Sequence, residues 1–270
     1  AQPMGFYGSA TLVEDGKRHA LVIQPIDVRC SAWDCTLESC PESGEGFAVR
    51  MGLRYVKSLH KDAGSRILAA RSAAPFASLN DFAARARLDT HVLVRLAEAG
   101  AFSGFEDARR AALWAAFGAE VPLEEGLALP VEEAHVPLAE LNDRERIAWD
   151  YAFTSHSTLG HPLEPMRQEL TRQKLPDAAT LRTFRNGARV RYAGLVICRQ
   201  RPGTAKGVLF MTLEDETGFV NLVVWEAVLK RFELLAKTQS FLGVTGKLQQ
   251  QDGVTHLVVA VSYTHLTLPT

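Results

Sequence analysis

The chain has 270 residues, enough for two or three small domains, and its 47% hydrophobic and 23% charged residues are ordinary globular values. A formal net charge of −1 excludes a global basic field, so any surface that binds nucleic acid must be local. No apolar run reaches the length of a membrane span, and the N-terminus lacks the charged and apolar regions of a signal peptide. We therefore expect a soluble cytoplasmic protein.

Residues 1–46 are too short and irregular to form a domain by themselves. Leu12–His19 is typical of the tail of a helix, Leu21–Val28 of a short strand, and Trp33–Leu37 of another extended piece. The segment starts without a methionine at position 1 and without a capping signal. We interpret it as the trailing part of a truncated domain.

Residues 47–118 have a helical pattern. Apolar positions between Val56 and Leu68 indicate two short helices, separated by His60-Lys61-Asp62. Ser78 is predicted to cap the next helix, because Asp81 stands at the third helical position. Short helices with tight connections are typical of a duplicated helix-hairpin-helix module.

Two segments connect this module to the rest of the chain. Residues 119–140 are acidic and interrupted by prolines, a composition that predicts a mobile linker. Residues 141–178 are interpreted as a helical connector, with helices at Leu141–Phe153 and Leu163–Leu170 around a loop at Thr158–Leu163.

Residues 179–261 have the pattern of a small barrel. Two apolar runs, Val208–Leu213 and Phe219–Trp225, are joined by the turn residues Glu214–Gly218 and predict a hairpin. A strand is expected before it and a helix and two strands after it, at Arg189–Arg199, Glu226–Ala236, Ser240–Leu248 and Val254–Val261. This is the order of the five-stranded OB barrel, a fold that commonly binds oligonucleotides. The predicted fold class is therefore multidomain α plus β, a helical tandem helix-hairpin-helix module followed by an OB barrel. Residues 262–270 break the pattern and are interpreted as a non-native tail.

Alternation along the central hairpin sorts its side chains into two faces. The core face is expected to hold Leu209, Met211, Leu213, Val220, Leu222 and Val224. The other face presents Phe210 and Phe219, and OB barrels bind single strands by stacking bases on such aromatics. Packing against a neighbouring domain fits both phenylalanines equally well. Cations that could follow the phosphates lie on the first strand and the next loop: Arg191, Arg199, Arg201 and Lys206.

Metal and catalytic motifs are not recognisable. The four cysteines lack the spacing of a zinc knuckle and are expected to be free thiols: Cys30, Cys35, Cys40 and Cys198. Ser155-His156-Ser157 lacks a nucleophile elbow, and His161 is interpreted as a loop-packing residue. We therefore predict no catalytic residue, metal ligand or cofactor in this chain.

Three blocks together resemble the C-terminal half of a bacterial C-family DNA polymerase, the error-prone relative of the polymerase III α subunit. The first block is similar to the end of its fingers region and consists of Phe6-Tyr7, Pro25-Ile26-Asp27-Val28 and Ser31-Ala32-Trp33-Asp34-Cys35-Thr36-Leu37-Glu38. Val49–Phe102, which ends in Leu96-Ala97-Glu98-Ala99-Gly100-Ala101-Phe102, is similar to its tandem helix-hairpin-helix module. The third block is Thr158-Leu159-Gly160-His161-Pro162-Leu163 followed by the barrel with Thr212-Leu213-Glu214-Asp215-Glu216-Thr217-Gly218. The order and spacing of the blocks make the resemblance specific over about residues 4–261.

The resemblance implies a DNA-directed DNA polymerase, a nucleotidyltransferase that copies damaged template in DNA replication and repair. Its polymerase site lies in a palm domain with two metal ions, Mg²⁺ in the parent enzyme, and nothing here matches that domain. The chain is therefore expected to be an inactive fragment, truncated at both ends. Replicative relatives bind the sliding clamp through a motif that begins with glutamine. Val121–Glu125 lacks the glutamine and the aromatic end, so clamp binding is not predicted.

A helix-hairpin-helix grips the duplex backbone through main-chain N–H groups, and Val56–Lys61 corresponds to its hairpin. The family usually has glycine where Ser58 and His60 stand, and both substitutions add a Cβ where the backbone should approach phosphate. Charge could come from Lys57, Lys61 and Arg66, and a hydroxyl donor from Ser58. The alternative is that these are solvated helix-end residues. The second repeat, near Leu88–Gly100, is interpreted as structural.

Two classes of function fit these observations. The chain could be the DNA-binding part of the polymerase, holding the primer–template duplex and contacting single-stranded template. It could instead dock accessory mutagenesis or replication proteins through its acidic linker and barrel, with little DNA affinity. The two modules in series favour DNA binding, and the near-neutral charge favours docking. An independent nuclease or hydrolase lacks a matching acid or metal cluster.

Overall fold

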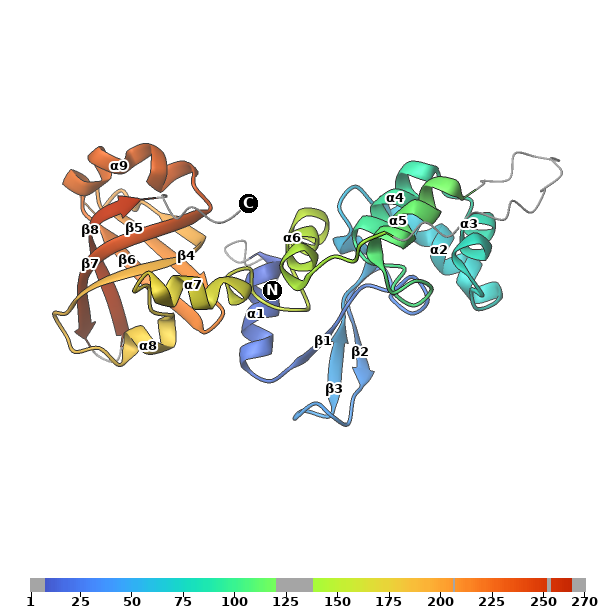
Figure 1. The fold of residues 1–270 in the computed structure, drawn as a ribbon, viewed down its shortest axis with the longest axis horizontal. Helices are drawn as coiled ribbons and strands as arrows, with labels where there is room; N and C mark the ends of the chain where they lie inside the picture. Colours follow the sequence, from blue (N-terminus) through green and yellow to red (C-terminus); the bar gives the residue numbers. More distant parts are fainter. Residues whose placement is uncertain (1–7, 120–137, 206, 252–253, 264–270) are drawn as a thin grey trace. The chain divides into compact units, whose positions relative to one another are not determined.

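The computed structural model describes residues 8–119, 138–205, 207–251 and 254–263, and the chain divides into two compact units (Figure 1). The helical unit comprises residues 19–159, and the barrel unit comprises residues 160–270 together with residues 1–18. Within the described ranges, no helix is long and apolar enough to cross a membrane. The domain boundaries expected from the sequence stay predictions. No local pattern indicated that the first 18 residues belong with the barrel.

The helical unit begins with a three-stranded sheet in the order β1-β3-β2 (Figure 1). Its strands are β1 (Val22–Gln24), β2 (Thr36–Ser39) and β3 (Phe47–Arg50), and β3 runs parallel to β1 and antiparallel to β2. The expectation of helix from residue 47 was therefore wrong at β3. Four residues are too few to show a period of two, and the pairing partners of β3 lie earlier in the chain.

Helices form the rest of this unit. They are the 3-10 turn η1 (Leu53–Tyr55), α2 (Lys61–Ala73), α3 (Leu79–Ala86), α4 (Thr90–Glu98), α5 (Arg109–Gly118) and α6 (Asp143–Thr154). The two short helices expected between Val56 and Leu68 are wrong, because α2 is continuous from Lys61. Ser78 accepts a hydrogen bond from the Asp81 amide at 3.1 Å, which confirms the predicted cap of α3.

The barrel unit contains a closed five-stranded barrel in the order β4-β5-β6-β8-β7. Its elements are α1 (Ser9–Arg18), the 3-10 turn η2 (Glu164–Met166), α7 (Arg167–Arg172), α8 (Ala178–Arg182), β4 (Arg189–Gln200), β5 (Leu209–Asp215), β6 (Gly218–Val224), α9 (Glu226–Thr238), β7 (Phe241–Gln251) and β8 (Val254–Tyr263). β6 and β8 are parallel, and the other neighbours are antiparallel. This arrangement confirms the predicted OB barrel and the predicted fold class.

The predicted core face of the central hairpin is also confirmed. All six side chains assigned to it are buried: Leu209, Met211, Leu213, Val220, Leu222 and Val224. They pack with Tyr192, Leu242 and Leu257 from the other strands. The last strand was predicted two residues too short, because β8 continues through Ser262 and Tyr263, which pair with Val244 and Gly243.

Two helical pieces precede β4 and pack on the barrel. Leu163, Leu170 and Leu175 cluster with Ala193 of β4, and Phe241 of β7 packs against this cluster. The short helix α8 was not predicted, although its cap is readable in the sequence. Asp177 Oδ1 accepts a hydrogen bond from the Thr180 amide at 2.6 Å.

The β5–β6 turn holds these helical pieces on the barrel through two carboxylates, one of them fully buried. Asp215 is fully buried. Its Oδ2 accepts from the Ala178 amide at 2.7 Å, and its Oδ1 accepts from the Thr217 and Gly218 amides at 2.9 and 3.1 Å and from Thr217 Oγ1 at 2.8 Å. Glu216 forms a bidentate pair with Arg167 of α7. The turn therefore fixes where α7 and α8 lie on the barrel.

Candidate nucleic-acid interface

The first hairpin keeps a backbone conformation that favours glycine. Ser58 has φ +65°, in the left-handed region, although it carries a Cβ. Val56 and Leu59 are buried on either side of it, while Ser58 and His60 are exposed. His60 is extended, with φ −82° and ψ 153°, so its conformation does not require glycine.

The second hairpin repeats this geometry. Arg87 has φ +49°, Leu88 is 1% exposed, and Asp89 is extended before α4, with φ −64° and ψ 147°. Each turn therefore has a left-handed residue, then a buried leucine, then an extended residue before the next helix. Asp89 places a carboxylate at the start of α4, where it would repel a phosphate. This observation supports the structural interpretation of the second repeat.

Lys57 is engaged inside the helical unit. Its Nζ donates to the backbone oxygens of Tyr151 and Ala152 at 3.0 and 2.6 Å, at the C-terminal end of α6. A cation at this end of a helix stabilises it by pairing with otherwise unpaired carbonyls. Lys61 and Arg66 are exposed on α2 and have no ion pair within the described part of the chain. These two residues are the better candidates for phosphate contacts.

Lys57→Met should therefore affect stability rather than DNA binding. The variant keeps the apolar stem but loses both hydrogen bonds to α6, and we expect the free energy of unfolding of the helical unit to fall by about 1 kcal/mol. Urea denaturation followed by circular dichroism measures the change. Lys61→Met is the matched control and should leave stability unchanged. A stable Lys57→Met protein with weakened duplex binding would contradict the assignment.

The two candidate stacking residues on the barrel differ. Phe210 is 39% exposed on the outer face, where Thr212 and Asn221 share a hydrogen bond of 3.1 Å. Phe219 instead lies under Arg18 of α1, with the guanidinium carbon 4.2 Å from the ring centroid. Phe210 can therefore still stack on a base, while Phe219 packs within the barrel unit.

The candidate arginines of the barrel differ in whether they already donate hydrogen bonds within the fold. Arg199 donates to the backbone oxygens of Ala236 and Gln239 at the end of α9, and burial lowers its pKa. Arg191 donates to the Gln173 oxygen at 3.0 Å. Arg201 is exposed in the loop after β4, and Lys206 of the same loop lies outside the described residues. Arg199 therefore has a structural partner, and Arg201 remains available.

Helix α1 covers one end of the outer face of β5 and β6 with buried charge. Arg18 donates to Glu214 at 3.0 Å, and Glu214 is only 1% exposed. Burial raises the pKa of Glu214 to about 7, against the lowering effect of Arg18. Close by, burial and the charge of Lys17 lower the pKa of His161 to about 3. The neutral His161 ring accepts from the Leu163 amide at 3.1 Å, which confirms its loop-packing role.

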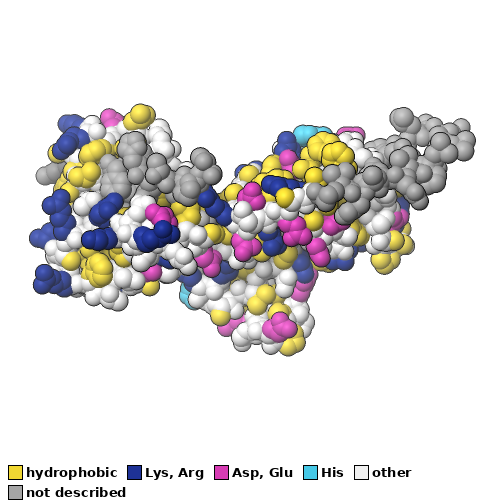
Figure 2. Space-filling view, viewed as in Figure 1, with side chains coloured by type: hydrophobic (Ala, Val, Ile, Leu, Met, Phe, Trp, Pro, Cys, Tyr) yellow, Lys and Arg dark blue, Asp and Glu magenta, His cyan; other side chains and the backbone are white. Residues whose placement is uncertain are grey.

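The near-zero net charge is the sum of a positively charged barrel unit and a negatively charged helical unit. The sequence of the barrel unit holds 16 Lys and Arg against 11 Asp and Glu, and that of the helical unit holds 14 against 20. Lys and Arg side chains are numerous over the barrel on the face shown in Figure 2, where acidic side chains are few. The local basic surface that the sequence required for nucleic acid is therefore on the barrel unit.

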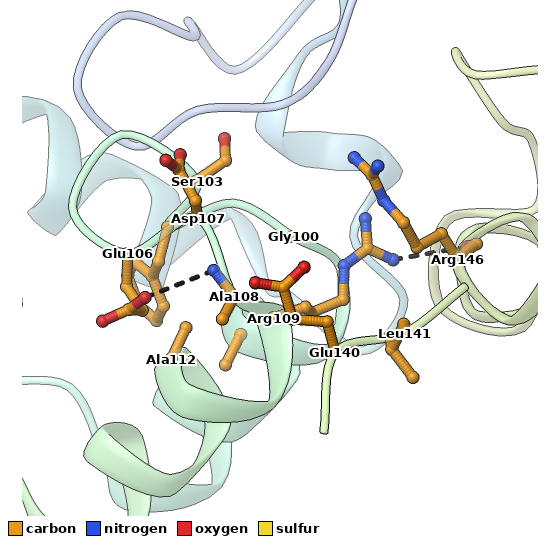
Figure 3. Close-up of a pocket in the computed structure, with 12 residues that line it drawn as sticks. Gly100, Ser103, Glu106, Asp107, Ala108, Arg109, Ala112, Glu140, Leu141 and Arg146 are labelled. Atoms are coloured by element: carbon orange, nitrogen blue, oxygen red, sulfur yellow. Dashed lines mark hydrogen bonds between the residues drawn. The ribbon is translucent and has the colours of Figure 1, made fainter. Parts of the chain in front are cut away.

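The helical unit has a pocket of about 290 Å³ beside the start of α5 (Figure 3). Arg109 and Arg146 line it together with three acids, Glu106, Asp107 and Glu140. Arg109 is held by Asp150 at 2.8 Å. The mixed charge of this pocket does not suit a polyanion. In the described ranges, no three His, Cys, Asp or Glu side chains are placed to hold a metal ion.

Comparison with known proteins agrees with this architecture. The helix-hairpin-helix motif family matches residues 20–112, and the OB-fold nucleic acid binding domain family matches residues 190–263. The error-prone DNA polymerase of Aromatoleum aromaticum is 40% identical over 99% of this chain and 25% of its own length. That of Alkalilimnicola ehrlichii is 44% identical over 96% of this chain and 25% of its own length.

A solved structure, asparaginyl-tRNA synthetase from Pyrococcus horikoshii, is 28% identical over 29% of this chain and 20% of its own length, with a TM-score of 0.26. The chain thus spans about a quarter of the length of the curated relatives that it matches. From identity over almost the whole chain and from the order of the two domains, it belongs to the bacterial error-prone DNA polymerases, as the C-terminal region with the helix-hairpin-helix and OB-fold domains.

Proposed function

We propose that this region is the DNA-binding part of a polymerase that copies damaged template in DNA repair. The helical unit would hold the primer–template duplex, and the barrel would contact single-stranded template. Nucleotidyl transfer with Mg²⁺ would take place elsewhere in the parent polymerase. The match to two nucleic-acid-binding domain types supports the proposal.

The observation that carries the duplex contact is the first hairpin. Its left-handed turn at Ser58 leads into α2, and no side chain of the described residues caps the start of that helix. Unpaired N–H groups at a helix start bind phosphate, and the exposed Lys61 and Arg66 outnumber the one acid of the first turn, Asp62. The clamp motif considered in the sequence, Val121–Glu125, lies outside the described residues.

Charge reversal on α2 tests the duplex contact. Lys61→Glu with Arg66→Glu should weaken binding of a labelled primer–template duplex about tenfold and reduce the slope of log affinity against log salt by about 1.8, about 0.9 per phosphate lost. Arg87→Glu in the second hairpin is the control and should change neither. Equal effects of the α2 variant and the control would remove the first hairpin from the interface.

Docking of accessory mutagenesis or replication proteins is the second candidate, and one feature favours it. Trp114 and Phe117 of α5 are 53% and 62% exposed, three residues apart on one helix face. If docking were the main role, the wild-type chain would bind neither duplex nor single strand even at low salt. Trp114→Ser with Phe117→Ser would then abolish partner binding.

A further inference from the structure

A pocket of about 450 Å³ lies on the barrel unit between the segment that leads into the barrel and the start of β4. Leu175, Phe184 and Val190 contribute to its lining, which is mostly apolar. It lies on strand β4, whereas Phe210 lies on β5. A pocket of this size with a mainly apolar surface can hold a planar ring.

Three cations and one acid, Asp177, are among the residues of this pocket. Lys174, Arg189 and Arg191 line it directly. Between residues 172 and 191 the sequence has six exposed cations and one acid, Asp177. The six are Arg172, Lys174, Arg182, Arg185, Arg189 and Arg191. Such a density of one sign attracts a polyanion and costs stability in its absence.

Two positively charged residues are paired across neighbouring strands of the barrel beside this pocket. Arg189 of β4 lies directly opposite Lys247 of β7, and both side chains are exposed. Like charges opposite each other on neighbouring strands are destabilising. Arg191 follows Arg189 on the same face, about 7 Å along the strand. An anion bound between these strands would remove the repulsion.

We propose that residues 171–191 together with Lys247, called the connector surface below, bind single-stranded nucleic acid. The phosphates contact Lys174, Arg189 and Lys247, and one base enters the apolar pocket. This inference rests on the proposed DNA-binding function and gives it a second site, away from Phe210.

The observations favour a nucleic acid over an acidic peptide. The cations come from the connector and from two strands, which suits the repeating charge of a backbone. Peptides commonly bind by adding a strand to a free sheet edge, and the described strands close the barrel without one. The matched domain type is also one that binds nucleic acid.

The test compares two double variants of the 270-residue chain. Lys174→Glu with Arg189→Glu reverses charge on the connector surface. Lys230→Glu with Lys237→Glu makes the same change in charge on α9. Affinity for a labelled oligothymidylate is measured by anisotropy across salt concentrations. We expect the connector variant to bind about tenfold more weakly and to lose about 1.4 from the salt slope, and the α9 variant to match wild type.

The melting temperature shows whether a variant that binds more weakly is still folded. Arg189→Glu turns the repulsive pair with Lys247 into an attractive one, so its melting temperature should equal or exceed that of wild type. The base contact is tested with an abasic strand of the same length. The abasic strand should bind several-fold more weakly than oligothymidylate. The Phe210→Ala variant should show the same difference in affinity between the two strands. Loss of the difference in Phe210→Ala would overturn the pocket assignment.

Three other outcomes overturn the proposal. If wild type binds oligothymidylate and both double variants match it, the connector surface is wrong but the proposed function stands. If wild type binds neither strand nor duplex at low salt, both fall. If the connector variant keeps oligothymidylate affinity but loses binding of an acidic, phenylalanine-containing peptide, the surface docks protein instead.

Discussion

Asp215→Ala is expected to lower the free energy of unfolding of the barrel unit by about 3–5 kcal/mol. The carboxylate accepts four hydrogen bonds while fully buried, and alanine would leave the donors of Ala178, Thr217 and Gly218 without partners. Urea denaturation measures the loss. Hydrogen exchange should locate it, because the amides of α8 and of the β5–β6 turn would exchange faster than those of the helical unit.

Two further variants make this prediction specific. In Asp215→Asn the amide oxygen can keep the three bonds made by Oδ1, while the NH₂ group faces the Ala178 amide. The loss should therefore be intermediate. Asp177→Ala removes only the cap of α8 and should cost about 1 kcal/mol. Equal losses in Asp215→Ala and Asp177→Ala would show that the buried carboxylate adds nothing beyond helix capping.

Glu214→Gln should remove a pH dependence from the barrel unit. Burial raises the pKa of Glu214 from 4.5 to about 7, so the folded state keeps a proton that the unfolded state releases. The stabilisation is fully present below pH 4.5 and is lost as the pH rises through about 7. Wild type should thus lose about 3 kcal/mol of unfolding free energy across this window relative to Glu214→Gln.

The comparison between these two proteins isolates Glu214. Glu14 and Asp215 also have pKa values raised by burial, but both are present in wild type and in the variant. Arg18 can still donate to the glutamine oxygen, so the contact between α1 and β5 is kept. Denaturation series at pH 4, 5.5, 7 and 8 provide the measurement. Parallel stability curves for the two proteins would show that Glu214 titrates normally.

The barrel was predictable because its evidence is local. Leu209 and Val224 alternate with outward residues on adjacent strands, and Gly218 closes the turn between them. A period of two over seven residues determines which side chains enter the core. Strand β3 was not predictable, since four residues show no period and its pairing partners are remote.

The candidate site was predictable only by residue type. The sequence predicts that Lys57 and Arg199 contact phosphates and that Phe219 can stack on a base. Only folding brings Lys57 to the end of α6, Arg199 to the end of α9 and Phe219 under Arg18. Each of these contacts joins residues far apart in the chain, so no local sequence pattern predicts it.

The OB barrel and the family can be recognised from the sequence alone, because they depend on periodicity, turn residues and motif order. Which cations remain available for a ligand depends on the folded structure. In the fold, Lys57 and Arg199 donate hydrogen bonds to backbone oxygens, and Arg189 lies opposite Lys247. A charged side chain binds a partner only when no closer one satisfies it, and that depends on distances which folding alone sets.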